Sequence, residues 1–293
     1  MNNKLLVILL TISSLSAFSQ LNQCVYFGGN AGMNSLMYSV KEGSSTPKLS
    51  YGGNIGYIYY FTPNWGIGTG VGVYLCATDG RLNGTKISIE GQIDDDWEHS
   101  PGETYRKDIY FRDWHEKQSF LLAEVPILVH YRYDFGLNKR REMYIQMGIR
   151  AQLPLMASYE ITRGEVELRG YYSKWNVELF EIIDPDRFVT RPIKGNGTLS
   201  LPFDIGACFG IGFSFEVSKI IDIYMGGYFN YGFLNLKSGN NGELLYLEND
   251  QIKYRGILLS SITEKVHLIS AQGELGMRFS IGKPFTRAGY KRR

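Results

Sequence analysis

Residues 203–235 read FDIGACFGIGFSFEVSKIIDIYMGGYFNYGFLN. Every second position from 203 to 217 is apolar, and the positions between carry glycine, polar side chains or one cysteine. After a break at 218–221 the alternation resumes and continues to residue 233. A period of two predicts two extended strands with one apolar face, joined as a hairpin. Each run is about twice as long as a strand in a soluble sandwich and matches the roughly 9–11 residues of a tilted membrane-crossing strand.

The first 19 residues have the pattern of a secretory signal peptide. Lys4 supplies the basic start, residues 5–12 form the apolar segment, and Ala17-Phe18-Ser19 provides small residues for cleavage. A lipoprotein signal at Cys24 is the alternative, but the residues before this cysteine lack the small side chain that such a signal needs. We therefore expect export, with residues 1–19 removed.

The composition agrees with an exported membrane protein. Aromatic residues make up 14% of the chain and glycine contributes 34 residues, yet beyond the signal no apolar run reaches the roughly 18–20 residues of a membrane-spanning helix. The three cysteines lie far apart, which predicts neither a disulfide framework nor a zinc site. A net charge of +2 gives no indication of nucleic-acid binding. We expect no metal and no other cofactor.

The same alternation recurs along the chain and predicts eight strands. They cover residues 24–38, 49–61, 65–77, 120–133, 143–155, 203–217, 222–235 and 267–281. Short connections alternate with long polar ones at 79–118, 158–201 and 238–265, while the first connection, 41–47, is brief. Short turns at one end and long loops at the other are typical of outer-membrane barrels.

The predicted fold is therefore all-β: an eight-stranded antiparallel up-and-down transmembrane β-barrel with long extracellular loops. The barrel domain covers residues 20–282, and residues 283–293 form a basic periplasmic tail. An even strand number places both termini in the periplasm. The alternative, a soluble sandwich, would need a second sheet over the apolar face.

Three segments resemble a known family. YGGNIGYIYYFTPNWGIGTGVGVYL (51–75), AEVPILVHYRY (123–133) and GELGMRFSIG (273–282) are similar to the small outer-membrane β-barrel domain family, in particular its PorT-like group. The resemblance implies an integral protein of a Gram-negative outer membrane, in contact with outer-membrane lipid. It implies no single activity, because members serve as channels, surface binders and accessories to secretion.

The last strand resembles the assembly signal that the barrel insertion machinery reads. The matching residues are Glu274, Gly276, Phe279 and Ile281. The resemblance thus implies the insertion machinery as a partner.

Charged residues on the predicted inner face are Glu124, Arg150, Glu274 and Arg278. The interior of an eight-stranded barrel is just wide enough for side chains to fill it. Tyr60, Tyr74, Tyr224 and Tyr228 are large enough to occupy the space beside the inner glycines of 65–77. We expect a paired ion network in a filled lumen. The alternative is a narrow passive diffusion channel lined by the same four charges.

The long loops carry aromatic residues that suit a binding surface. The candidates are Trp97, Tyr105, Trp114, Tyr171, Tyr172 and Trp175. Alternatively, these rings pack the loops together. The loops also contain strand-like pieces, including 244–247 facing 251–254, so we expect the barrel wall to continue above the membrane as hairpins.

Catalysis has little support in the sequence. His115, near Asp113 and Ser119, is the only seed of a hydrolytic site, and closeness in sequence does not establish triad geometry. We predict no catalytic residues, with a surface hydrolase as a further alternative. The expected function is a non-enzymatic outer-membrane barrel whose surface loops serve binding or assembly with other envelope proteins.

Overall fold

The structure is a computed structural model that describes residues 22–40, 43–94, 102–135, 140–180, 188–237, 242–248 and 251–281. The expected signal peptide (1–19) and basic tail (283–293) lie outside the described residues.

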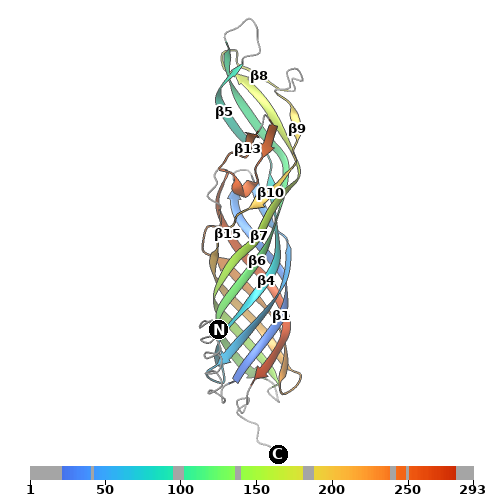
Figure 1. Cartoon of the computed structure of the whole chain (residues 1–293), viewed down its shortest axis with the longest axis vertical. Coiled ribbons are helices and arrows are strands. Elements are labelled where there is room, and N and C mark those ends of the chain that lie inside the picture. Colours follow the sequence, from blue (N-terminus) through green and yellow to red (C-terminus); the bar gives the residue numbers. More distant parts are fainter. Residues whose placement is uncertain are drawn as a thin grey trace, which may run out of the picture.

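Eight strands close into a tilted barrel (Figure 1). They are β1 (Asn22–Val40), β3 (Leu49–Tyr60), β4 (Trp65–Leu82), β6 (Glu103–Phe135), β7 (Arg141–Tyr172), β11 (Asp204–Glu216), β12 (Ile221–Gly232) and β15 (Thr263–Ile281). Each pairs antiparallel with the next one along the chain, and β15 pairs with β1 to complete the ring. The predicted barrel of eight strands is confirmed. Among the described residues, no helix is long and apolar enough to cross a membrane.

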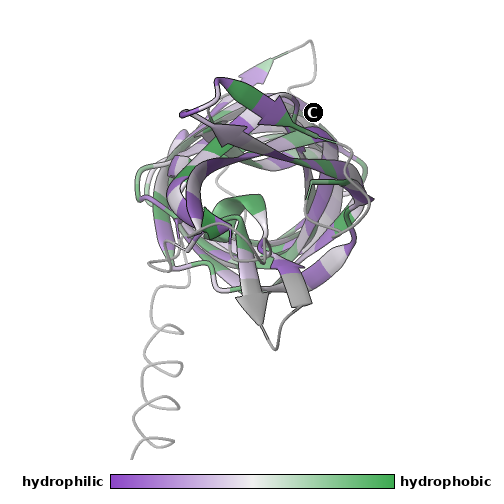
Figure 2. Ribbon diagram, turned by 90° about the horizontal axis from the view of Figure 1, so that it is seen from above, coloured by the Kyte–Doolittle hydropathy of each residue, from purple (hydrophilic) through white to green (hydrophobic). Residues whose placement is uncertain are grey.

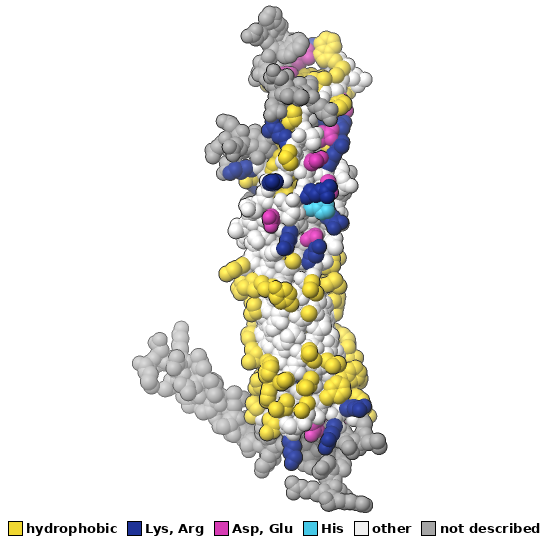
Figure 3. Space-filling model, turned by 90° about the vertical axis from the view of Figure 1, so that its right-hand side faces the viewer, with side chains coloured by type: hydrophobic (Ala, Val, Ile, Leu, Met, Phe, Trp, Pro, Cys, Tyr) yellow, Lys and Arg dark blue, Asp and Glu magenta, His cyan; other side chains and the backbone are white. Residues whose placement is uncertain are grey.

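The lower half of the barrel carries its apolar side chains on the outside. In β11, for example, Phe209, Ile211 and Phe213 are exposed, while Gly210 and Gly212 between them are buried. We call this outer apolar surface the lipid-facing belt. It includes Phe27, Ile55, Ile67, Val71, Leu75, Val125, Ile127, Val129, Met147, Ile149, Met225, Phe229 and Leu275. Hydrophobic side chains gather in the lower half of Figure 3, as a wall in contact with acyl chains requires.

The upper half of the molecule reverses this pattern. Phe111, Trp114 and Phe120 of β6 point inward and are buried in an apolar core. Lys, Arg, Asp and Glu side chains cover the outside instead (Figure 3). Because the core faces inward and the charges face water, this part of the wall is built as a soluble protein would be.

The predicted long loops are largely strand, so the expected continuation of the barrel wall above the membrane is confirmed and extends further than the strand-like pieces indicated. Residues 79–118 contain the end of β4, β5 (Thr85–Asp94) and the first part of β6, and 158–201 contain the rest of β7. Three short strands also belong to that second segment: β8 (Val177–Leu179), β9 (Thr190–Pro192) and β10 (Gly195–Leu199), all paired with β7. The brief connection at 41–47 contains β2 (Gly43–Pro47), paired with β4. We call β5, β8, β9, β10 and the upper parts of β6 and β7 the strand extension.

The described residues of the segment 238–265, which are 242–248 and 251–265, fold over and into the barrel mouth. β13 (Leu245–Glu248) pairs with β14 (Gln251–Tyr254), which confirms the predicted hairpin within one residue. The 3-10 turn η2 (Ile257–Leu259) follows, and Ile257 and Leu258 are buried in the apolar core. Seen from above, η2 lies within the ring of strands (Figure 2). The backbone N–H of Ile257 donates to Glu116 Oε2 at 2.8 Å, which fixes this plug to β6.

Candidate functional site

The lumen of the lower half is packed by tyrosines set against glycines. Inner glycines of β4 leave room for rings from β3 and from β4 itself: a Cβ at Gly66 would lie 2.8 Å from the Tyr60 ring. A Cβ at Gly72 would lie 2.7 Å from the Tyr74 hydroxyl. Larger residues at these positions would displace the rings, so the glycines allow the tyrosines to fill the interior.

The upper ion pair of the lumen joins β6 and β7. Arg150 Nη1 donates to Glu124 Oε1 at 2.6 Å, and both side chains are buried. The Tyr74 hydroxyl donates to the same carboxylate at 2.9 Å. The guanidinium also lies 3.9 Å from the centre of the Tyr228 ring. In the strand register Glu124 is opposite Gln152, so the Glu124–Arg150 ion pair runs diagonally between β6 and β7.

The lower ion pair connects strands on opposite sides of the lumen. Arg278 of β15 donates to Glu142 of β7 at 2.7 Å, and β11 and β12 separate these two strands in the wall. Arg132 lies 3.7 Å from the other oxygen of Glu142 and stacks on Tyr60. The predicted site did not include Glu142 or Arg132. The alternation of 120–133 does place Arg132 on the inner face beside His130, and the same alternation with Gln146 could have added Glu142.

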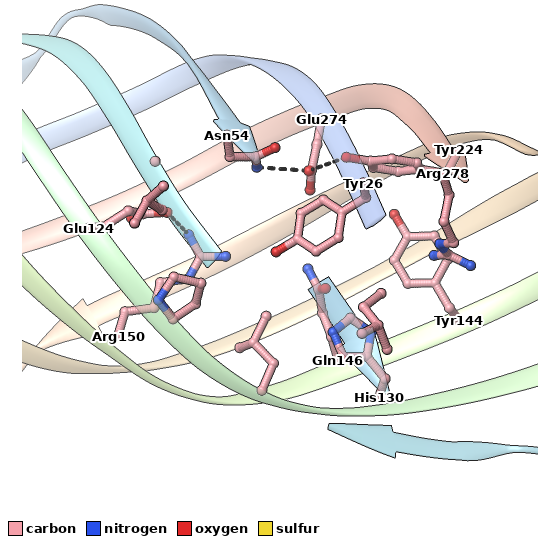
Figure 4. A pocket seen from close by; sticks show the side chains of 15 residues that line it. Tyr26, Asn54, Glu124, His130, Tyr144, Gln146, Arg150, Tyr224, Glu274 and Arg278 are labelled. Atoms are coloured by element: carbon pink, nitrogen blue, oxygen red, sulfur yellow. Dashed lines mark hydrogen bonds and ion pairs between the residues drawn. The ribbon is translucent and has the colours of Figure 1, made fainter. Parts of the chain in front are cut away.

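Glu274 has neutral partners. Its carboxylate accepts hydrogen bonds from Asn54 Nδ2 at 2.9 Å and from the Tyr224 hydroxyl at 2.8 Å (Figure 4). Arg278 stands four residues further along the same strand, which is about 13 Å. The structure therefore does not bring Glu274 and Arg278 together, although both face the lumen.

The space left between these side chains is small. A cavity of about 20 Å³ lies between Tyr26, Glu124, Arg150, Glu274 and Tyr144 (Figure 4). This volume holds about one water molecule. The guanidinium groups of Arg132, Arg150 and Arg278 and the carboxylates of Glu124, Glu142 and Glu274 share the surrounding interior, and Glu124 and Glu142 are paired with arginine. The arrangement suits a structural plug rather than a conduit.

The aromatic candidates of the strand extension have different surroundings. Tyr105 stacks on Tyr172 with ring centres 5.3 Å apart and meets Phe188 edge-on. The Tyr172 hydroxyl donates to Asp94 at 2.6 Å, and its ring is buried. These two rings hold β6, β7 and the segment at Phe188 together, as the packing alternative proposed.

The predicted surface role of Trp114 is wrong. It is fully buried in the apolar core, because above the belt the inward positions of β6 are the apolar ones. Trp97 lies outside the described residues.

Two candidates remain accessible near the tip of the extension. Trp175 is 61% exposed, and its indole N–H donates to Glu103 at 2.8 Å. The Tyr171 ring is half-buried under the Arg106 guanidinium, 4.6 Å from the ring centre. Val177 and Phe180 are exposed nearby on the segment that follows Trp175. Together these side chains form an aromatic surface with adjacent charge.

A ladder of ion pairs covers the outer face of the extension. Asp108 contacts Lys86 at 2.8 Å and Arg106 at 3.0 Å. Burial alone would raise the pKa of Asp108, but hydrogen bonds from Lys86, Ser88 and Arg106 lower it below its ordinary value. Arg112 and Arg169 both contact Glu167. The Lys86–Asp108 and Arg112–Glu167 pairs join neighbouring strands and help to hold the β5–β6–β7 sheet in register, whereas Arg106–Asp108 and Arg169–Glu167 each lie within one strand.

The three residues of the hydrolytic seed are not assembled as a triad. His115 Nε2 lies 2.9 Å from Asp113 Oδ1, and Arg163 contacts the same carboxylate at 2.5 Å. Ser119 stands four residues further along β6, about 13 Å away in an extended strand. The described residues contain no group of three or more side chains placed to hold a metal ion.

The residues that resemble an assembly signal lie on β15 beside β1. Phe279 stacks on Phe27 with ring centres 5.5 Å apart, and Ile281 is exposed at the end of the strand. Gly276 faces inward, where a Cβ would lie 2.6 Å from the Tyr224 hydroxyl. Glu274 shares this inner face. The strand thus serves the packing of the lumen and the closure of the ring.

A closed antiparallel ring with an apolar exterior defines a transmembrane β-barrel. The chain belongs to the outer membrane protein beta-barrel domain family, whose model matches residues 18–238. No curated protein matches the sequence at a significant level.

Solved structures with a similar course of the chain are outer-membrane proteins. OprG from Pseudomonas aeruginosa is 8% identical with a TM-score of 0.43, covering 90% of this chain and 98% of its own. Ail of Yersinia pestis is 11% identical with a TM-score of 0.31, covering 89% and 99%. Neisserial surface protein A is 9% identical with a TM-score of 0.34, covering 88% and 97%.

Proposed function

We propose that this protein is a non-enzymatic, non-conducting outer-membrane barrel whose strand extension binds other proteins of the cell envelope. The observation that supports this function is the contrast between the two halves. The lower lumen has room for about one water, whereas β6 and β7, with 33 and 32 residues, are about three times as long as a membrane crossing requires.

The strand extension offers an edge for binding. Among the described residues β5 pairs only with β6, so it ends the sheet on that side. An exposed strand edge binds extended peptide segments through backbone hydrogen bonds, with alternate side chains adding specificity. The accessible Trp175 and Phe180 are residues of the kind that dominate binding energy at interfaces. The resemblance to the PorT-like group supports an accessory role in secretion as one form of this binding.

Conductance separates the proposal from the channel alternative. The purified protein in planar bilayers should show conductance near the baseline, because the side chains and the plug at η2 fill the path. Steady ion current through the unmodified protein would establish the diffusion channel lined by Glu124, Arg150, Glu274 and Arg278 instead.

Site-specific crosslinking tests the binding surface. A photoreactive amino acid at Glu90, exposed on β5, should give a discrete protein adduct in native membranes. The same group at Leu75, in the lipid-facing belt, should give none and serves as the matched control. Phe180→Ala should weaken the adduct formed at Glu90 if the two surfaces contact one partner. No adduct from Glu90, or equal adducts at both positions, would argue against a partner on the extension.

A further inference from the structure

A shallow depression of about 480 Å³ lies on the outer wall, where the lipid-facing belt ends. Ala77 and Asp79 of β4, Lys117 of β6, and Lys48 and Leu49 before and at the start of β3 line it. Its lower edge is apolar: Leu49 is 71% exposed, and two residues below Ala77 the belt residue Leu75 is opposite Leu121. The depression therefore spans the level at which acyl chains give way to polar head groups.

The upper edge of the depression is cationic. Lys48 contacts Asp79 at 2.7 Å, and Lys117 stands directly opposite Asp79 in the strand register. Arg81 follows two residues further along β4, opposite His115. Among the described residues, Lys117 and Arg81 have no carboxylate within ion-pair distance. Two neighbouring positive charges are thus available for an anion at this level.

The surrounding carboxylates leave the region positive. Asp79 already forms an ion pair with Lys48, and Asp113 contacts both Arg163 and His115. Glu160 is opposite Lys117 on β7 without forming an ion pair with it. Four cations, Lys48, Arg81, Lys117 and Arg163, thus stand against the three accessible carboxylates of Asp79, Asp113 and Glu160. Glu116 also lines the depression, but it is buried, and burial raises its pKa to about 7. Lys and Arg gather with acidic side chains directly above the hydrophobic part of the wall (Figure 3).

We propose that this depression binds a membrane lipid that carries a phosphate group. Lys117 and Arg81 would contact the phosphate, with Lys48 beside it, and the acyl chain would lie along Leu49, Leu75 and Leu121. Cations beside a membrane surface attract anionic head groups, and guanidinium groups suit phosphate oxygens. The inference depends on the placement of the belt in the membrane and not on the partner-binding function.

The test compares lipids retained by the full chain. The protein is purified into phosphatidylcholine nanodiscs that contain a minor fraction of phosphatidic acid or of diacylglycerol, and the retained lipid is measured by native mass spectrometry. Each cation near the surface changes affinity about fivefold. The double variant Arg81→Gln/Lys117→Gln should therefore lose phosphatidic acid binding by roughly 25-fold. Diacylglycerol should be retained weakly by both proteins.

Two further variants serve as a control without effect and as a change expected to strengthen binding. Lys219→Gln, an exposed lysine in the short turn between β11 and β12, should bind like the unmodified protein. Asp79→Asn removes the competing carboxylate and should increase phosphatidic acid binding. Equal binding by the unmodified protein and the double variant, or equal retention of diacylglycerol, would overturn the proposal. Displacement by inorganic phosphate at matched concentration would reassign the depression to a free anion.

Discussion

Single side chains in the lumen are stabilised by partners on other strands. Arg150 has Glu124 and the Tyr228 ring, and Arg278 has Glu142. A charge buried without such a partner is strongly unfavourable, since desolvation is no longer offset. These buried ion pairs therefore contribute to the stability of the barrel, whether or not ions pass through the lumen.

Removal of one partner of the upper pair should destabilise the barrel. Glu124→Gln or Arg150→Met alone leaves a buried charge uncompensated, at a cost of about 3–5 kcal/mol. The double substitution should recover part of this loss, because neighbouring groups are not additive. Thermal unfolding in detergent checks the cycle, with Lys219→Gln as a control. Single variants as stable as the unmodified protein would indicate that water solvates these charges.

Glu116 links stability to pH above the membrane. Burial raises its pKa to about 7, although Gln118 and the N–H of Ile257 donate hydrogen bonds to it. The folded state thus binds a proton that the unfolded state has released. Its stability should fall as pH rises from about 4.5 to about 7, by on the order of 3 kcal/mol.

Glu116→Gln keeps a hydrogen-bond acceptor for Ile257 but cannot titrate. Unfolding midpoints of both proteins between pH 5 and 8 give the contribution of Glu116 as their difference. The difference should grow in favour of the glutamine variant as pH rises. Parallel pH profiles would show that Glu116 does not carry this dependence.

At the level of strands, the same alternation of apolar and polar side chains has opposite orientations inside and above the membrane. In β6 the exposed Val125, Ile127 and Val129 face lipid, whereas above the belt the outward positions include Lys117 and the inward ones Phe120. The same β-strand therefore changes its apolar face from outside to inside as it leaves the membrane. Many of the inward-facing glycines lie where a neighbouring strand or a ring approaches closely, whereas glycines such as Gly29 have open space beside them.

Gly148 and Gly29 provide a matched pair for that close approach. A Cβ at Gly148 would clash with the backbone carbonyl oxygen of Ile127, whereas a Cβ at Gly29 meets nothing within 4 Å. Gly148→Ala should lower stability by about 1–3 kcal/mol through overpacking, and Gly29→Ala should be near neutral. Unfolding in urea compares the two. Equal midpoints would mean that the wall relaxes around the methyl group.

For the whole molecule, the architecture predicts an orientation in the membrane. Gln23 is opposite Ile281, so the described start and end of the chain lie together at the end with the short turns. The strand extension projects from the other end (Figure 1). We expect the extension outside the cell and the short turns in the periplasm.

Accessible cysteines test this orientation, because Cys24, Cys76 and Cys208 are free and buried. Ser173→Cys, exposed near the tip, should react with a membrane-impermeant maleimide on whole cells. Lys219→Cys, in the turn after β11, should react only after permeabilisation. The reverse pattern would mean that the barrel is inserted in the opposite direction.

The sequence alone determined the eight strands, their lipid-facing sides and the inner positions of Glu124 and Arg150. Side-chain alternation is local to each strand, and lipid requires an unbroken apolar face, so period and length were sufficient. Ring closure decided what no strand encodes by itself: that Arg278 meets Glu142 across the lumen, and that Trp114 points inward. Above the membrane, ring closure decides which face of each strand points inward. The segment at η2, which fills the barrel mouth, supplies the apolar partners of that face. The sequence of 79–118 therefore predicted strand-like pieces in a surface loop, but only the tertiary structure places its apolar residues, such as Phe111 and Trp114, in a core.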